Sequence, residues 1–141
     1  MQVNIKMAII NHGKLKSMTN LKENIPCLSI RQPWAWLIAQ GYKDVENRTW
    51  RTKHRGTIYI HASQTIDTLA VSVFKEELPD ITFPKRFDTG GIIGRAELID
   101  CVTEHGSEWF EGPYGFVMAN PELVDYYPLK GKLRLFHATF P

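Results

Sequence analysis

The stretch that decides the fold runs from Leu28 to Ser63 and reads LSIRQPWAWLIAQGYKDVENRTWRTKHRGTIYIHAS. It holds three of the four tryptophans of the 141-residue chain. Between Arg31 and Arg55 six lysines and arginines stand against two acids, a local net charge of +4, whereas the whole chain nets +2 and the remainder therefore −2. A basic, aromatic face of this kind is the electrostatic footprint of a surface that meets phosphate and stacks on bases.

The first half of this stretch predicts a short strand followed by a short helix. Residues 27–30 read as the strand, and Pro33 stands where a helix begins, since its missing N–H costs nothing at that position. An apolar i, i+3, i+4 pattern follows, and Gly41 ends it. Trp34 and Trp36 are ~200° apart on such a helix, so they cannot both face inward. Trp34 is the candidate for the cleft side, although its apolar partners are equally typical of a core position.

The second half of the stretch predicts two strands. Residues 43–53 read as extended, with Glu46, Arg48 and Trp50 on one face, because strand side chains alternate. A glycine turn signal follows, and β-forming residues fill 57–62. We therefore expect these two segments to pair antiparallel.

Beyond this stretch the pattern predicts one more helix and three more strands. An apolar stripe over residues 66–78 predicts a structural helix capped by Ser63 or Thr65. The further strands are predicted over residues 92–102, 114–119 and 132–140. Few helices between many short strands favour a curled sheet over a parallel one. We predict an α+β fold, a mixed β-barrel of five to six strands with two short helices near the N-terminal side.

The remainder of the chain indicates an ordinary globular domain. Residues 1–24 show no sustained period and are predicted to be a flexible extension, with a single domain over 25–141. Without a signal-peptide core or an apolar span, the default location is cytoplasmic, with no membrane partner. Cys27 and Cys101 are far apart and are expected as reduced thiols. The five histidines show no metal-ligand spacing, so no metal and no cofactor are indicated.

Several motifs together resemble one known family. They are L-S-I-R-Q-P-W-A from Leu28, G-Y-K-D-V-E-N-R-T-W-R-T-K from Gly41, R-G-x-I-x-I-H-A-S from Arg55, E-G-P-Y-G-F from Glu111 and K-G-K-L-x-L-F from Lys130. Over about residues 26–140 the chain resembles the ASCH family, the domain named for activating signal cointegrator homology. The resemblance implies a PUA-like β-barrel with a cleft suited to RNA or a nucleotide-like ligand.

The candidate binding residues are basic and aromatic side chains around this cleft. Arg31 and Gln32 stand just ahead of a helix start, where free N–H groups attract anions, and a plain helix cap is the alternative for Gln32. Lys43, Glu46 and Arg48 form the most chemically suggestive cluster, with ordinary ion pairing as the alternative. The predicted binding set is Arg31, Gln32, Trp34, Lys43, Arg48, Trp50, Arg51, Lys53, Trp109 and Tyr114.

Two activities implied by the resemblance give catalytic candidates. Some ASCH proteins resemble amidohydrolases that remove an acyl group from a modified cytidine with a lysine, a threonine and a glutamate. Lys43 falls on the lysine position, whereas Glu46 occupies the threonine position, and the acids at 104, 108 and 111 offer no single match. Others resemble ribonucleases, for which Lys53, His61 and Ser63 are candidates, because histidine moves protons and lysine stabilises a phosphorane. His61 is equally typical of a hydrogen-bonded core residue.

Three functions are therefore open. The leading prediction is a module that binds single-stranded RNA or a nucleotide-like ligand in a basic, aromatic cleft. A small hydrolase is the first alternative, acting on single-stranded RNA or on a modified nucleoside. A protein-interaction module in gene regulation is the second.

Overall fold

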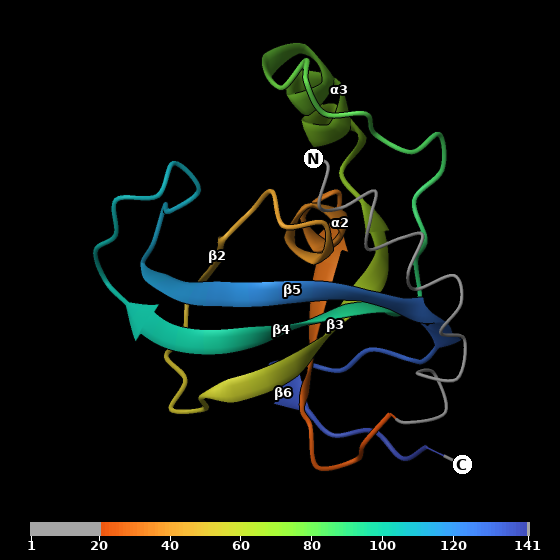
Figure 1. Ribbon diagram of the computed structural model, residues 1–141, viewed down its shortest axis with the longest axis vertical. Coiled ribbons are helices and arrows are strands. Elements are labelled where there is room, and N and C mark those ends of the chain that lie inside the picture. The colour runs from red at the N-terminus through yellow and green to blue at the C-terminus, as the bar shows by residue number, and fades with distance from the viewer. Residues whose placement is uncertain (1–20, 141) are drawn as a thin grey trace.

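The computed structural model describes residues 21–140, which form one curled β-sheet with two short helices (Figure 1). The elements are β1 (Cys27–Gln32), α2 (Trp34–Ala39), β2 (Val45–Arg48), β3 (Gly56–Ile66), α3 (Thr68–Glu77), β4 (Gly91–Val102), β5 (Tyr114–Pro128) and β6 (Leu135–Phe136). The strands lie in the order β2-β5-β4-β3-β1-β6, and β1 runs parallel to β3. This half-barrel confirms the predicted α+β, PUA-like mixed β-barrel.

The strand pairing differs from the prediction in one respect. The antiparallel pair expected between residues 43–53 and 57–62 is absent among the described residues. Instead β2 pairs with β5, from Val45 opposite Val117 to Arg48 opposite Tyr114, and β3 lies between β4 and β1. The reason is that residues 49–55 do not form a hairpin turn. They carry the chain from an edge strand to the middle of the sheet, so the extended segment ends at Arg48.

Two strand lengths also differ from the prediction. β5 continues beyond residue 119 because its pairing with β4 shifts register at Asn120 and Pro121, and a bulge accommodates a proline that a regular ladder excludes. The strand predicted over 132–140 is reduced to β6. Arg134 just before it has φ 56°, a left-handed conformation that interrupts an extended chain.

Helix α2 packs inside the curl of the sheet and joins the core. Leu37 and Ile38 are buried, and Gly41, with φ 89°, follows the helix end as predicted. The helix approaches the sheet closely at Gly94 of β4, where an added Cβ would lie 2.9 Å from the Cβ of Ala39. The short helix therefore fills the half-barrel and fixes the position of the chain on either side of it.

Helix α3 is not the structural core element that its apolar stripe predicted. None of its residues is buried, and Leu69 is 73% exposed. Figure 1 shows the helix at one end of the molecule, clear of the strands. Its N-cap is Asp67, which accepts from the Ala70 N–H at 2.9 Å, rather than Ser63 or Thr65, because β3 runs on through both. Within residues 21–140, neither helix is long and apolar enough to cross a membrane.

The N-terminal extension is described only at its end. Residues 1–20 of the predicted flexible segment lie outside the described residues. Residues 21–24 contact the domain: the Lys22 N–H donates to the Tyr59 hydroxyl at 2.8 Å, and the Glu23 carboxylate accepts from the Phe140 N–H at 3.1 Å. These contacts attach the end of the predicted extension to β3 and to the C-terminal segment.

Both cysteines are free thiols, as expected. Cys27 is fully buried in β1, and this burial raises the pKa of its thiol to about 11. The neutral thiol therefore behaves as a small apolar side chain in the core.

Replacing a core leucine should cost far more stability than replacing a leucine of α3. Leu98 is fully buried, so Leu98→Ala leaves a cavity and should lower the free energy of unfolding by ~2–5 kcal/mol. The matched control Leu69→Ala should change it by ~0.5 kcal/mol or less. Urea denaturation measures both. An equal loss at Leu69 would show that α3 belongs to the core after all.

Candidate functional site

A hollow of ≈ 770 Å³ opens where β1, α2, β2 and α3 meet the loop before β5. Ten residues of the stretch that the sequence singled out line it, together with residues of segments far away in the chain. Its lining consists of Ser29, Ile30, Arg31, Trp34, Lys43, Glu46, Asn47, Arg48, Thr49, Trp50, Phe74, Glu77, Leu78, Glu108, Trp109, Glu111 and Gly112. We call it the aromatic hollow.

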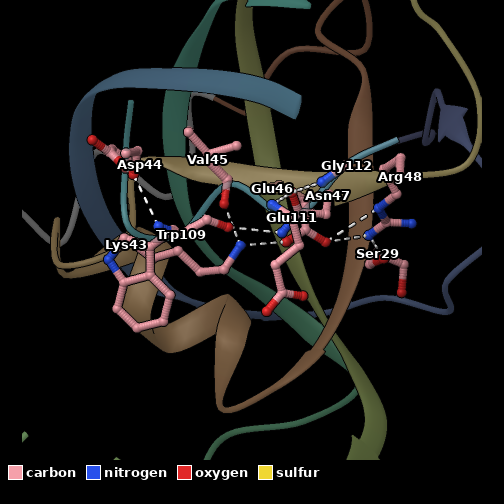
Figure 2. A network of polar contacts seen from close by, with 11 residues as sticks. Ser29, Lys43, Asp44, Val45, Glu46, Asn47, Arg48, Trp109, Glu111 and Gly112 are labelled. Atoms are coloured by element: carbon pink, nitrogen blue, oxygen red, sulfur yellow. Dashed lines mark hydrogen bonds and ion pairs between the residues drawn. The ribbon is translucent and has the colours of Figure 1, made fainter. Parts of the chain in front are cut away.

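Lys43, Glu46 and Arg48 form an ion triad in the wall of the aromatic hollow (Figure 2). The Lys43 ammonium donates to Glu46 Oε1 at 2.8 Å and also to the carbonyl of Val45. The Arg48 guanidinium donates to Glu46 Oε2 twice, from Nε at 3.1 Å and from Nη2 at 2.9 Å. Lys43 and Glu46 are only 3% and 8% exposed. The cluster is therefore a buried, charge-assisted network rather than a pair of surface ions.

The same arginine ties the two ends of the curled sheet together. Its Nη2 also donates to the backbone carbonyl of Ser29 at 2.9 Å. Arg48 belongs to β2, at one edge of the sheet, and Ser29 belongs to β1, near the other edge. No strand pairing links β1 and β2 within residues 21–140, so this side-chain contact bridges the gap that leaves the sheet a half-barrel.

Asn47 holds the opposite wall. Its side-chain Nδ2 donates to the carbonyl of Trp109 at 2.9 Å, and its Oδ1 accepts from the N–H groups of Glu111 and Gly112 at 2.8 and 3.1 Å. Asn47 points away from the Glu46 and Arg48 side of β2, as strand alternation predicts. The two opposite faces of this four-residue strand thus have separate roles. One contributes Glu46 and Arg48 to the triad, and the other fixes the loop that carries Trp109 (Figure 2).

Three aromatic rings border the opening between this loop and α3. Phe74 of α3 makes edge contacts with Trp34, at 6.2 Å between ring centroids, and with Trp109, at 5.7 Å. The Arg31 guanidinium lies 4.9 Å from the Trp34 ring. The structure thus places Trp34 at the hollow, while Trp36 packs away from it among other rings. Sequence reasoning missed Phe74, because its apolar stripe was interpreted as that of a structural helix.

Trp50 connects the hollow to the C-terminal part of the chain. One side of its ring meets Phe116 at 5.0 Å, and the guanidinium of Arg134 lies 5.0 Å from its centroid. Arg134 was not singled out from the sequence, because it stands outside the basic stretch and only the fold brings it to Trp50.

Four of the predicted binding residues are not in the lining of the aromatic hollow. Gln32 is 1% exposed; its Oε1 accepts from the Trp36 N–H at 2.9 Å and its Nε2 donates to the Asp88 carbonyl at 2.8 Å, so it takes the alternative role of a cap. The other three lie farther along the chain. Arg51 stacks on Tyr114, at 5.4 Å from the ring centroid, and Lys53 lines a separate hollow.

The charge of the aromatic hollow differs from the expected basic character. Its lining contains three cations, Arg31, Lys43 and Arg48, and four carboxylates, those of Glu46, Glu77, Glu108 and Glu111. The local excess in the sequence came partly from residues 51–55, which lie elsewhere. The acids come from distant segments that a local count does not include. The hollow is therefore aromatic and mixed in charge.

His61 and Ser63 line a second hollow of ≈ 740 Å³, beside the loop that follows β5. His61 is 1% exposed; its Nδ1 lies 2.9 Å from Ser29 Oγ and its Nε2 lies 2.5 Å from the Leu129 carbonyl. Only a ring nitrogen that carries its proton can face a carbonyl, so Nε2 donates and Nδ1 accepts from the serine hydroxyl. Burial lowers the pKa of His61, which keeps the ring neutral.

The five catalytic candidates are therefore not brought together. Lys43 and Glu46 line the aromatic hollow, His61 and Ser63 line the second one, and Lys53 lines a third. A joint role for Lys53 and His61 has no geometric support. Lys43 with Glu46 is the remaining close pair.

The curled, mixed six-stranded sheet with two short helices is the architecture of an α+β, PUA-like domain. The chain belongs to the ASCH domain family, whose model matches residues 28–130. It is similar to activating signal cointegrator 1 of Homo sapiens and of Mus musculus, at 33% and 32% identity over 125 residues. The match covers 78% of this chain and 22% of each relative, so the chain spans about a fifth of their length. At the level of the family, this membership supports a PUA-like RNA-binding domain.

Removing the charge of Glu46 should destabilise the domain strongly. Glu46→Gln leaves the buried Lys43 and the partly buried Arg48 without their shared counter-ion, so the free energy of unfolding should fall by ~3–5 kcal/mol. The control Glu122→Gln breaks an exposed pair with Arg95 and should cost ~1 kcal/mol or less. Chemical denaturation compares the two. Similar small losses would mean that the triad is not a structural link.

The buried histidine should make stability fall in mild acid. Because the pKa of folded His61 lies below its ordinary value of 6.5, the unfolded chain takes up the proton more readily. The stabilisation is present above about pH 6.5 and is lost as the pH falls toward the folded pKa, by at most ~1.4 kcal/mol per pH unit. Unfolding at pH 7.5 and 5.5 should show a larger loss for the wild type than for His61→Gln. Equal losses in the two proteins would contradict a buried neutral ring.

Proposed function

We propose that this domain binds single-stranded RNA and takes one base into the aromatic hollow. The observation that supports this most directly is the pair of tryptophans, Trp34 and Trp109, in the lining of a hollow that Phe74 of the loosely packed α3 also borders. Base stacking on aromatic side chains contributes ~1–3 kcal/mol per base and tolerates any base. A helix without buried residues can shift to admit a base at small cost in packing.

The polar lining suits the edge of a base better than a polyphosphate. Carboxylates such as Glu111 accept hydrogen bonds from exocyclic amino groups, whereas guanidinium groups such as that of Arg31 donate to ring nitrogens and carbonyls. The lining carries four carboxylates against three cations, a balance that disfavours a dense cluster of phosphates. Only an unpaired base can enter a hollow of this kind, so the proposal is for single-stranded RNA rather than a duplex.

A hydrolase is the second candidate, and one observation favours it. The buried Lys43 ammonium and the Glu46 carboxylate face a hollow large enough for a nucleoside. Both of the hydrogen bonds of Lys43, however, go to acceptors of the domain itself. The ammonium has three N–H donors, so one remains for a substrate. Product analysis of RNA and of acylated nucleosides, with Lys43→Ala as the control, separates binding from cleavage.

Removing either tryptophan of the hollow should weaken RNA binding. Trp34→Leu and Trp109→Leu keep an apolar side chain but remove the stacking surface, so the dissociation constant for a mixed-sequence single-stranded dodecamer should rise about 5- to 150-fold. Fluorescence anisotropy of labelled RNA measures it. Trp36→Leu is the matched control, because Trp36 packs against Tyr42 and Phe83 away from the hollow.

The control should bind RNA like the wild type once circular dichroism shows that it is folded. Absence of saturable RNA binding by the wild type at low salt would overturn the proposal and favour a protein-interaction module. Equal binding by all the tryptophan variants would move the RNA site elsewhere on the surface.

A further inference from the structure

We infer that the second hollow is a phosphate subsite for the same RNA strand, next to the base held in the aromatic hollow. This inference rests on the proposed function. The hollow, of ≈ 740 Å³, lies between the loop of residues 129–133 and the strands β1 and β3, and we call it the lysine hollow. Its residues belong neither to the ion triad nor to the aromatic rings described above, and among the described residues the two hollows share Ser29.

The two hollows differ in the sign of their charge. The lining of the lysine hollow contains Lys130 and Lys132 and no carboxylate, whereas carboxylates outnumber cations in the aromatic hollow. Both lysines are exposed, and across residues 21–140 neither of them is in an ion pair. A phosphodiester would therefore meet two uncompensated ammonium groups here and net repulsion in the other hollow. Phosphate contacts of this type position a strand without reading its sequence.

The loop that carries the lysines is held in place before any ligand arrives. Its Leu129 carbonyl accepts from the buried His61 ring, which in turn accepts from the Ser29 hydroxyl. At Gly131 the backbone lies directly on this pair, since an added Cβ would be 2.8 Å from His61 Cε1 and 2.9 Å from Ser29 Oγ. The two lysines thus flank a glycine that packs directly against the His61–Ser29 pair. The loop should therefore lose little conformational freedom on binding.

The two hollows are joined at Ser29. Its carbonyl accepts from Arg48 on the side of the aromatic hollow, and its hydroxyl pairs with His61 on the side of the lysine hollow. The lysine loop continues into Arg134, whose guanidinium stacks on Trp50 of the aromatic hollow. A strand with its base beside Trp109 would reach the two lysines by crossing Ser29, with Arg48 and Arg134 along the way.

The salt dependence of binding tests the phosphate subsite. Each phosphate contact contributes ~0.7 to the slope of log affinity against log salt for a single strand, so Lys130→Ala/Lys132→Ala should lower the slope by up to ~1.4. The charge-matched control Lys85→Ala/Arg86→Ala removes two exposed cations outside both hollows and should leave the slope unchanged. Trp109→Leu should lower the affinity at every salt concentration without changing the slope.

The outcomes separate the two claims. If the wild type and the tryptophan variants behave as proposed but the lysine variant keeps the wild-type slope, the phosphate subsite is wrong and the base site stands. An equal fall of the slope in the charge-matched control also overturns the subsite, because the effect would then reflect net charge. If the wild type binds no RNA, the proposed function fails and the subsite fails with it.

Discussion

The structure depends on one buried carboxylate that two cations share. Glu46 accepts from Lys43 on one oxygen and from Arg48 on the other, and Arg48 passes the link on to the backbone of β1. Replacing such a triad by apolar side chains often costs nothing, because desolvation offsets the attraction. Apolar side chains, however, could not bond to the Ser29 carbonyl. What the triad supplies is a directional contact that fixes how far apart the two ends of the sheet lie.

This constraint positions the site as well as the sheet. Glu46 and Arg48 lie on the face of β2 that contacts β1. The opposite face presents Asn47, which binds three backbone groups of the loop around Trp109. The same strand, β2, therefore positions Trp109 and makes the contact with β1. A loop whose backbone is held by hydrogen bonds loses little freedom on binding, which suits Trp109 to the proposed role of a stacking surface.

The sequence predicted those features that depend on neighbours in the chain. The helix between Pro33 and Gly41 and the common face of Glu46 and Arg48 follow from spacing alone, and the structure places them as expected. Lys43 joins them from the segment before β2. The partner of β2 could not be predicted in the same way, because Val45 meets Val117 across the fold. Pairing of β2 with the next strand was the natural local expectation, and closure of the half-barrel overrides it.

The same limit applied to the candidate site. Residues 51–53 were grouped with Arg48 because they are close in sequence, yet the chain turns out of the aromatic hollow after Trp50. Phe74 and Glu111 reach the hollow from two separate segments and Arg134 reaches Trp50 from a third, so no local pattern grouped them with the basic stretch. A net charge counted along the chain therefore misjudged the electrostatics of a surface that four segments build together.

The position of α3 bears on how a ligand enters. Its residues Leu69 and Val73 face solvent, and its ring contacts run through Phe74 to the two tryptophans that the base would use. A base that stacks on either tryptophan competes with Phe74 for the same surface. The edge contacts that are lost, at ~0.5–1.5 kcal/mol each, are of the size that base stacking returns. Under the proposed function, moving α3 aside breaks no core packing, because none of its residues is buried.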